Sequence, residues 1–311
     1  MRLESALLRA FSYLSFLILS LHPTFVLHYL IYIGMKFITN EPSLRTFLPN
    51  AFTSVEGETS LFDKLQPFLI IAEHWLQQQV LGEATLASIA HEDSDANILC
   101  CQIVVSEGFS RAIPSLDLVL TPNGFGIVSN SNVAPASKER VERLIAQLQD
   151  NRDTYLQSLL AILPSREEWL GTAQQLFFAG TLFPNTDIVD QVGRRTKTPK
   201  WSQYVALRYE LIDIEHSLAE EYFSEELMSD LRAKAHVNNL SDAYAYILPI
   251  IRAQELAVLN KLPIQHRQMT DAVNFIRKHP DEFPLWHASD TAKLYNPPVF
   301  QNKKIDTAYW L

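Results

Sequence analysis

The chain has 311 residues, of which 47% are hydrophobic and 20% are charged, and its formal net charge is −9. This composition is typical of a globular protein and excludes a disordered chain, while the acidic balance argues against a free-standing DNA- or RNA-binding module. Nine glycines are too few for the common phosphate-binding loops, and the only two cysteines, Cys100 and Cys101, are adjacent in an apolar run. We therefore expect a reduced compartment, with both thiols as small core residues.

The first predicted element is a hydrophobic leader over residues 1–34. No Lys, Arg, Asp or Glu occurs from Ala10 to Met35, and a stretch of this length can span a bilayer. Pro23 interrupts it and no Ala-x-Ala-like cleavage site follows, which argues against a signal peptide. Three interpretations stay open: a mis-assigned start with translation beginning at Met35, a membrane anchor, or a buried helix.

Two amphipathic helices are predicted next. The first follows Ser60, whose hydroxyl is suited to cap it, and ends at Gly82. Its apolar positions recur at helical spacing: Leu65, Leu69, Ala72, Leu76 and Val80. The second helix is expected from about Asp95 to Ile113, with Pro114 closing it.

A β-hairpin is predicted over residues 116–128. Leu116, Leu118 and Leu120 alternate with Asp117, Val119 and Thr121, and Pro122-Asn123-Gly124 then turns the chain into Phe125-Gly126-Ile127-Val128. Alternation around an Asn-Gly turn is a hairpin signal.

Helices are predicted for most of the remaining chain. One is expected over 137–163, and the capping-box pattern at 165–168 predicts a short helix that contains Trp169. Another follows Pro199, which suits a first helical turn, and a shorter one is expected over 225–231.

An internal repeat organises these elements. The helix after Ser60 and the helix after Pro199 align at an offset of 142 residues, and an apolar helix and a third helix follow each. The alignment pairs Leu65 with Leu207, Leu69 with Leu211, Glu73 with Glu215, His74 with His216, and Leu76 with Leu218. We predict a mainly α fold of two tandem helical bundle units, residues 35–171 and 172–311, with the one β-hairpin inserted in the first.

No pattern of catalytic residues is present, so neither enzymatic activity nor a cofactor or metal is expected. His91-Glu92-Asp93-Ser94-Asp95 lacks the glycine and terminal glutamate of a calcium loop, and a solvated loop is the favoured interpretation. In Glu73-His74 and Glu215-His216, adjacent helical residues point about 100° apart and so cannot chelate one ion from a single face. One member of each pair should be exposed, and the other should make a polar contact between helices.

Two further surface features are weaker signals. The basic loop 194–200 offers Arg194, Arg195, Lys197 and Lys200 beside Trp201 as candidate phosphate contacts, although a solvated loop suits an acidic protein better. The C-terminal tail carries Tyr309 and Trp310. Because aromatic residues are costly to expose, we expect the tail to dock onto a neighbouring subunit or onto its own core.

The segments Leu116–Val128 and Asn132–Val141 resemble an uncharacterised family of phage and prophage proteins of gut bacteria, which is in turn similar to helical head–tail connector (adaptor) proteins. The resemblance lies in order and spacing over most of Met35–Leu311 and is strongest from Leu61 to Leu163. It implies a small helical bundle that carries a hairpin or long loop. Many copies of such a bundle form a ring beneath the portal, and no catalytic residues are implied.

This resemblance leads us to expect a virion structural protein that forms a homo-oligomeric ring and contacts portal and tail proteins, located in the virion and, during assembly, in the host cytoplasm. DNA should pass without sequence-specific binding, because an acidic wall repels phosphates. The expected assembly contacts are Leu118, Leu120, Asn123, Gly124 and Phe125 of the hairpin, with Tyr309 and Trp310 of the tail. The alternative is a membrane-anchored helical protein, if residues 1–34 are part of the native product.

Overall fold

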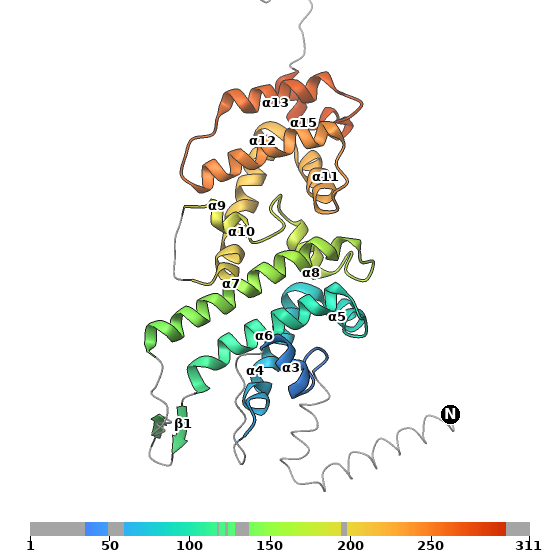
Figure 1. Cartoon of the computed structure of the whole chain (residues 1–311). Coiled ribbons are helices and arrows are strands. Elements are labelled where there is room, and N and C mark those ends of the chain that lie inside the picture. The colour runs from blue at the N-terminus through green and yellow to red at the C-terminus, as the bar shows by residue number, and fades with distance from the viewer. Residues whose placement is uncertain are drawn as a thin grey trace, which may run out of the picture. The chain divides into compact units, whose positions relative to one another are not determined.

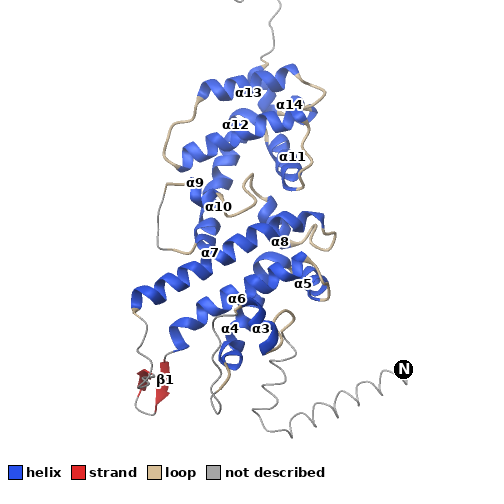
Figure 2. Ribbon diagram, in the orientation of Figure 1, coloured by secondary structure: helices blue, strands red, loops and turns tan. Residues whose placement is uncertain are grey.

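The chain is mainly helical (Figures 1 and 2) and divides into two compact units, Met1–Gln175 and Leu176–Leu311. The computed structural model describes residues 35–48, 59–116, 118–121, 124–127, 137–193 and 198–296. The hydrophobic leader over residues 1–34 lies outside the described residues. The division between the units falls just after the predicted boundary between residues 171 and 172.

The first unit is built on three long helices, in which α6 packs against both α4 and α7. Its elements in chain order are α3 (Glu41–Phe47), α4 (Leu61–Leu76), the π-helical turn η1 (Gln77–Leu81), α5 (Glu83–Ala90), α6 (Asp95–Leu116), β1 (Leu118–Thr121), β2 (Gly124–Ile127), α7 (Lys138–Ile162) and the 3-10 turn η2 (Leu163–Ser165). Helix α8 (Ala173–Ala179) spans the division between the units.

Helix α4 follows the predicted pattern. The Ser60 hydroxyl accepts a hydrogen bond from the Asp63 amide (3.1 Å) and caps the helix. The apolar stripe Leu65, Leu69, Ala72 and Leu76 is fully buried, and α6 approaches it closely at Gly108. A Cβ at position 108 would lie 2.9 Å from the Leu69 side chain. Glycine at this position therefore sets how near α4 and α6 lie.

Two predicted boundaries in the first unit are wrong. Helix α6 continues through Pro114 to Leu116. A proline in the last turn removes only one backbone hydrogen bond, and the packing of α6 against α4 and α7 offsets that loss. The pattern at 165–168 does not open a helix: the Ser165 hydroxyl donates to the carbonyl of Ile162 (2.7 Å), and Trp169 lies in turns. Trp169 is fully buried in this turn.

The second unit repeats the theme of a long first helix followed by a short and a long one. Its elements are α9 (Ile188–Gln191), α10 (Lys200–Leu218), the π-helical turn η3 (Ala219–Phe223), α11 (Glu225–His236), α12 (Asp242–Leu259), α13 (His266–Lys278), α14 (Pro284–His287) and α15 (Asp290–Tyr295). Its core includes Leu218, Phe223, Leu231, Ile247, Ile251, Ile276, Phe283 and Trp286.

The two units share unusual local geometry at the offset of 142 residues. Each first helix ends in a π-helical turn, at 77–81 and at 219–223. Each turn is followed by a residue of positive φ, Gly82 (φ 77°) and Ser224 (φ 65°). Because π-helical turns and positive φ outside glycine are both uncommon, their recurrence at one offset is what the repeat hypothesis expects.

A buried indole completes this arrangement in each unit. The Trp169 Nε1–H donates to the carbonyl of Val80 in η1, and the Trp286 Nε1–H donates to the carbonyl of Tyr222 in η3, both at 2.8 Å. Val80 and Tyr222 are also separated by 142 residues. The last carbonyls of a helix have no partner within it, so each indole satisfies one at the end of the first helix of its unit.

Candidate assembly surfaces

The hairpin is placed between the two longest helices of the first unit, beyond the end of α6 and before the start of α7 (Figure 1). β1 and β2 pair antiparallel, with Leu118 opposite Ile127 and Leu120 opposite Phe125. They form a sheet of two strands, and among the described elements each strand packs chiefly against the other. Of the predicted assembly residues, Leu118, Leu120, Gly124 and Phe125 lie in these strands, whereas Asn123 lies outside the described residues.

The tail and most of the basic loop fall outside the described residues, including Tyr309, Trp310, Arg194, Arg195 and Lys197. Lys200 is described and begins α10, where its ammonium lies 2.6 Å from the carboxylate of Asp190. This ion pair already engages the one described member of the predicted phosphate set.

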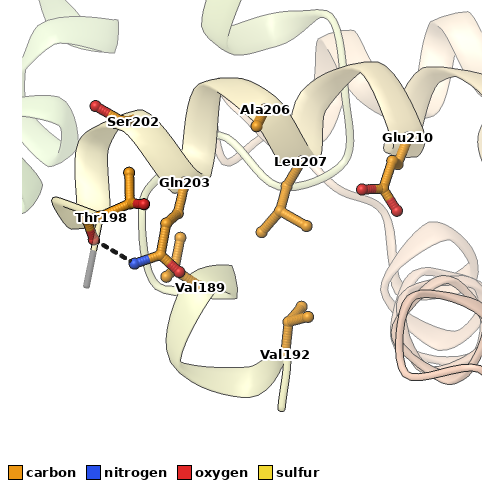
Figure 3. Close-up of a pocket in the computed structure, with 8 residues that line it drawn as sticks. All are labelled: Val189, Val192, Thr198, Ser202, Gln203, Ala206, Leu207 and Glu210. Carbon is orange, nitrogen blue, oxygen red and sulfur yellow. Dashed lines mark hydrogen bonds between the residues drawn. The ribbon is translucent and has the colours of Figure 1, made fainter. Parts of the chain in front are cut away.

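A cavity of about 220 Å³ lies between α9 and α10 (Figure 3). The Gln203 side-chain amide donates to the carbonyl of Thr198 (2.6 Å), which ties the first turn of α10 to the segment before it. Ser202, Ala206 and Glu210 are spaced four residues apart and exposed, so the cavity runs along one face of α10. The described residues that line it are Val189, Val192, Thr198, Ser202, Gln203, Ala206, Leu207 and Glu210.

A second, larger cavity of about 560 Å³ lies where α12 faces the segment around Pro184. Its lining includes the charged side chains of Asp187 and Arg252 and several side-chain amides. The Arg252 guanidinium also donates two hydrogen bonds to the carbonyl of Leu182 (2.9 and 2.6 Å). The two cavities therefore differ in chemistry, since the one between α9 and α10 has a largely apolar floor.

Each repeated Glu-His pair has one exposed and one buried member, as predicted, but among the described residues only Glu215 makes the expected polar contact between helices. Glu73 and Glu215 are 4% and 0% exposed, whereas His74 and His216 are exposed. The Glu73 carboxylate accepts hydrogen bonds from the backbone amides of Lys36 (2.9 and 3.0 Å) and Phe37 (3.2 Å). Burial raises the pKa of Glu73, and these amide donors oppose that shift.

In the second unit, the Glu215 carboxylate accepts from the Leu182 amide (2.7 Å) and from Arg232 (2.9 Å). Burial raises its pKa, and both donors oppose the shift. In both units, then, the buried glutamate of the first helix holds the backbone of a segment that precedes that helix. The role of this glutamate is structural.

Glu255 is a buried ionisable group of the described chain. It is fully buried on α12, and neither carboxyl oxygen has a hydrogen-bond partner among the described residues. Burial raises its pKa well above the ordinary value, and the neighbouring Glu215 raises it further, against the opposing effect of Arg252 and Arg232. Burial without a hydrogen-bond donor therefore favours the neutral form of this carboxyl group.

Sequence reasoning missed the buried ionic groups of the first unit. Arg152 on α7 is 4% exposed and lies 2.6 Å from Glu107 on α6 and 2.7 Å from Asp153. Glu107 and Arg152 are 45 residues apart, and no local pattern joins them. Such pairs fix the register between α6 and α7, because a buried charge is costly when it is separated from its partner.

The cluster from His91 to Asp95 joins neighbouring segments of the first unit. The Arg166 guanidinium donates to both carboxylate oxygens of Glu92 (2.8 and 2.6 Å), which lowers the pKa of Glu92 to about 2. Among the described residues, no group of three or more His, Cys, Asp or Glu side chains is arranged to hold a metal ion. Within the same ranges, no helix combines the length and the apolar character that a membrane span requires.

Comparison with known proteins finds a similarity for only part of the chain. Residues 49–176, less than half of the chain, match the model of a family described as "Family of unknown function (DUF6712)". The matched range ends where the first unit ends, so the similarity concerns that unit. No curated protein and no solved structure matches the chain.

Proposed function

We propose that this protein is a structural connector of the head–tail adaptor type, whose copies form a ring between a portal and a tail. Two tandem helical bundle units form the body of each copy, and the hairpin inserted in the first unit is its main contact with a neighbouring copy. The chemistry is that of assembly, and no step of bond making or breaking is involved.

The observation that carries the proposal is the two-stranded hairpin inserted between α6 and α7. An isolated two-stranded hairpin is marginally stable in water, and its outer strand edges present unpaired backbone groups. The strands Leu118–Thr121 and Gly124–Ile127 contain no charged residue, so no charge discourages another chain from covering them. A neighbouring copy that covers the hairpin would pair with its free strand edges, and this contact would stabilise both the hairpin and the complex.

The charge of the chain suits a channel for DNA. A net charge of −9 opposes binding to phosphates, and sequence-independent DNA affinity comes almost wholly from neutralising phosphates with Lys and Arg. Lys200, one of the proposed cationic contacts, is paired with Asp190. A ring of such subunits lets DNA pass without trapping it.

The first test is deletion of residues 121–126 from the full chain. We expect the wild-type protein to form a discrete oligomer in mass photometry and sedimentation velocity, and the deletion variant to remain a monomer with an unchanged far-UV circular dichroism spectrum. The helical units keep their own cores, so the loss is confined to assembly.

A matched pair of charge variants controls for nonspecific effects. Leu120→Lys adds a cation to β1, and Gln79→Lys adds the same charge at an exposed position in η1. The first should abolish the oligomer and the second should leave it intact. Assembly of the deletion variant, or a wild-type chain that stays monomeric at all concentrations, contradicts the proposal.

The proposed neighbours are tested in host cells in which the encoding element is induced. A tagged pull-down analysed by mass spectrometry should recover portal and tail components, and the same spectra identify the native N-terminus. Recovery of membrane proteins together with an intact Met1 leader would instead support the membrane-anchored alternative.

A further inference from the structure

We propose that Glu255 and the Leu182 segment, residues 181–187, form a pH-dependent switch within the second unit, in which ionisation of Glu255 releases the segment. This inference goes beyond the proposed function and does not depend on it, because it concerns a movement inside a single copy.

Two charged side chains hold the backbone of Leu182 from opposite sides. The Glu215 carboxylate on α10 accepts a hydrogen bond from the Leu182 amide (2.7 Å), and the Arg252 guanidinium on α12 donates two to the Leu182 carbonyl (2.9 and 2.6 Å). The Tyr204 hydroxyl donates to the next carbonyl, that of Phe183 (3.1 Å). Leu182 is only 1% exposed. A loop that is buried so deeply needs partners for its backbone groups, and here they come from ionised side chains.

Glu255 interacts with the same two side chains. It follows Arg252 by three residues on α12, and residues with this spacing lie on the same side of a helix. After burial, the strongest influences on the pKa of Glu255 are the charges of Glu215, which raises it, and of Arg252, which lowers it. The two groups that hold Leu182 are therefore the two whose charges act most strongly on Glu255.

The other charged groups of this region come from neighbouring helices. Arg232 on α11 lies 2.9 Å from Glu215 and also acts on Glu255, and Arg208 on α10 acts on Glu215. Helix α13 meets α12 through a neutral contact, in which Gln254 donates to the Gln268 side chain (2.9 Å). Glu215 thus has cationic partners, whereas Glu255 has no hydrogen-bond donor among the described residues.

Ionisation of Glu255 weakens both contacts to Leu182. The new carboxylate would repel that of Glu215 and would draw the Arg252 guanidinium away from the Leu182 carbonyl. A buried carboxylate without a donor is also costly, and release of the Leu182 segment would admit water to it. The closed form therefore favours the neutral acid, and the open form favours the carboxylate.

The direction of the pH dependence follows from this linkage. The pKa of Glu255 is raised in the closed form, and in the open form it returns toward the ordinary value of about 4.3. Between these two values, opening releases a proton, so the equilibrium constant for opening rises by up to about tenfold per pH unit. Above the closed-form pKa, it becomes constant.

Hydrogen exchange of the full chain from pH 5 to 9, corrected for the intrinsic pH dependence of amide exchange, tests the switch. In the wild type, protection of residues 181–187 should fall as the pH rises, while α12 retains its protection. Glu255→Gln keeps the shape of the neutral acid and should keep the protection of 181–187 constant. Glu226→Gln removes an exposed glutamate of α11 and should behave like the wild type.

Infrared spectroscopy reports on the acid itself. The difference spectrum between the wild type and Glu255→Gln should contain the carbonyl stretch of a protonated carboxyl group. This band should persist while the protection of 181–187 falls and should disappear at the pH where the protection becomes constant.

Four results would overturn the proposal. The first two are constant protection of 181–187 in the wild type, and an equal pH dependence in Glu255→Gln. The third is a parallel loss of protection in α12, which would show that ionisation unfolds the whole unit instead of releasing one segment. The fourth is the absence of a protonated-carboxyl band at every pH.

Discussion

Replacing the buried indoles of Trp169 and Trp286 with phenylalanine tests whether they stabilise the ends of the first helices. Each indole N–H lies 2.8 Å from a carbonyl oxygen in a π-helical turn, that of Val80 or Tyr222. Both tryptophan side chains are fully buried, so solvent does not replace the lost donor. Trp75→Phe is the control, because Trp75 lies on α4 with its side chain only half-buried.

The magnitude follows from two terms. A buried carbonyl left without its donor costs about 1–3 kcal/mol, and the smaller ring leaves a void that costs about 1 kcal/mol more. We expect Trp169→Phe and Trp286→Phe each to lower the free energy of unfolding of its own unit by about 2–4 kcal/mol. That is a large share of the 5–15 kcal/mol typical of a folded domain. The control should cost less than about 1 kcal/mol.

Native-state hydrogen exchange by mass spectrometry resolves the two units in the intact chain. In Trp169→Phe, amides of peptides over residues 77–90 should exchange about 30- to 1,000-fold faster, the factor that corresponds to 2–4 kcal/mol. In Trp286→Phe, the acceleration should appear over residues 219–236. Acceleration below threefold in both variants would show that the indoles do not support these turns.

Two other substitutions have clear directions. Gly108→Ala should lower the urea midpoint, with a cost of about 1–3 kcal/mol, because its Cβ would lie 2.9 Å from the Leu69 side chain and 3.2 Å from its Cα; an unchanged or higher midpoint would mean that α4 and α6 can separate freely. Glu255→Gln should stabilise the protein increasingly as the pH rises. The pKa of Glu255 is raised in the folded state. Above the ordinary glutamate pKa of about 4.3, the folded state therefore binds more protons than the unfolded state. The stability of the wild-type protein then falls as the pH rises from about 4.3 through the folded pKa. Thermal unfolding of both proteins from pH 4 to 8 measures the difference, and a difference that does not change with pH contradicts the assignment.

Periodicity and capping residues predicted the long helices because those signals are local. Ser60 and the leucines at helical spacing lie within one segment, and α4 forms there. The angle between adjacent helical residues predicted that one member of each Glu-His pair is exposed and the other is not. The structure shows that the buried members are Glu73 and Glu215.

Other features depend on contacts between distant segments and have no local signal. The pairing of Arg152 with Glu107 joins two helices, and a sequence window contains only one of them. The cavity depends on α9, a helix of four residues that is too short for a periodic pattern to identify. At Trp169 a local signal was present but misleading. The preceding residues have the pattern of a capping box, yet no helix forms there, because the Trp169 indole is buried and donates a hydrogen bond to the distant carbonyl of Val80.

The residues that follow the two π-helical turns bear on how the ancestry of such a chain can be traced. Gly82 (φ 77°, ψ 172°) and Ser224 (φ 65°, ψ 151°) have nearly the same backbone conformation, although a residue with a side chain carries a strain of about 1–3 kcal/mol in this region. The Ser224 hydroxyl accepts a hydrogen bond from the Leu227 amide (3.3 Å), a compensation that glycine cannot offer. Two different residues can thus keep the same backbone conformation at this position while the amino-acid sequences diverge. Distant relatives of this chain would then be recognised by three structural features, even where their sequences are no longer similar. These features are a π-helical turn, a residue of positive φ after it, and an indole N–H that donates to a carbonyl of the turn.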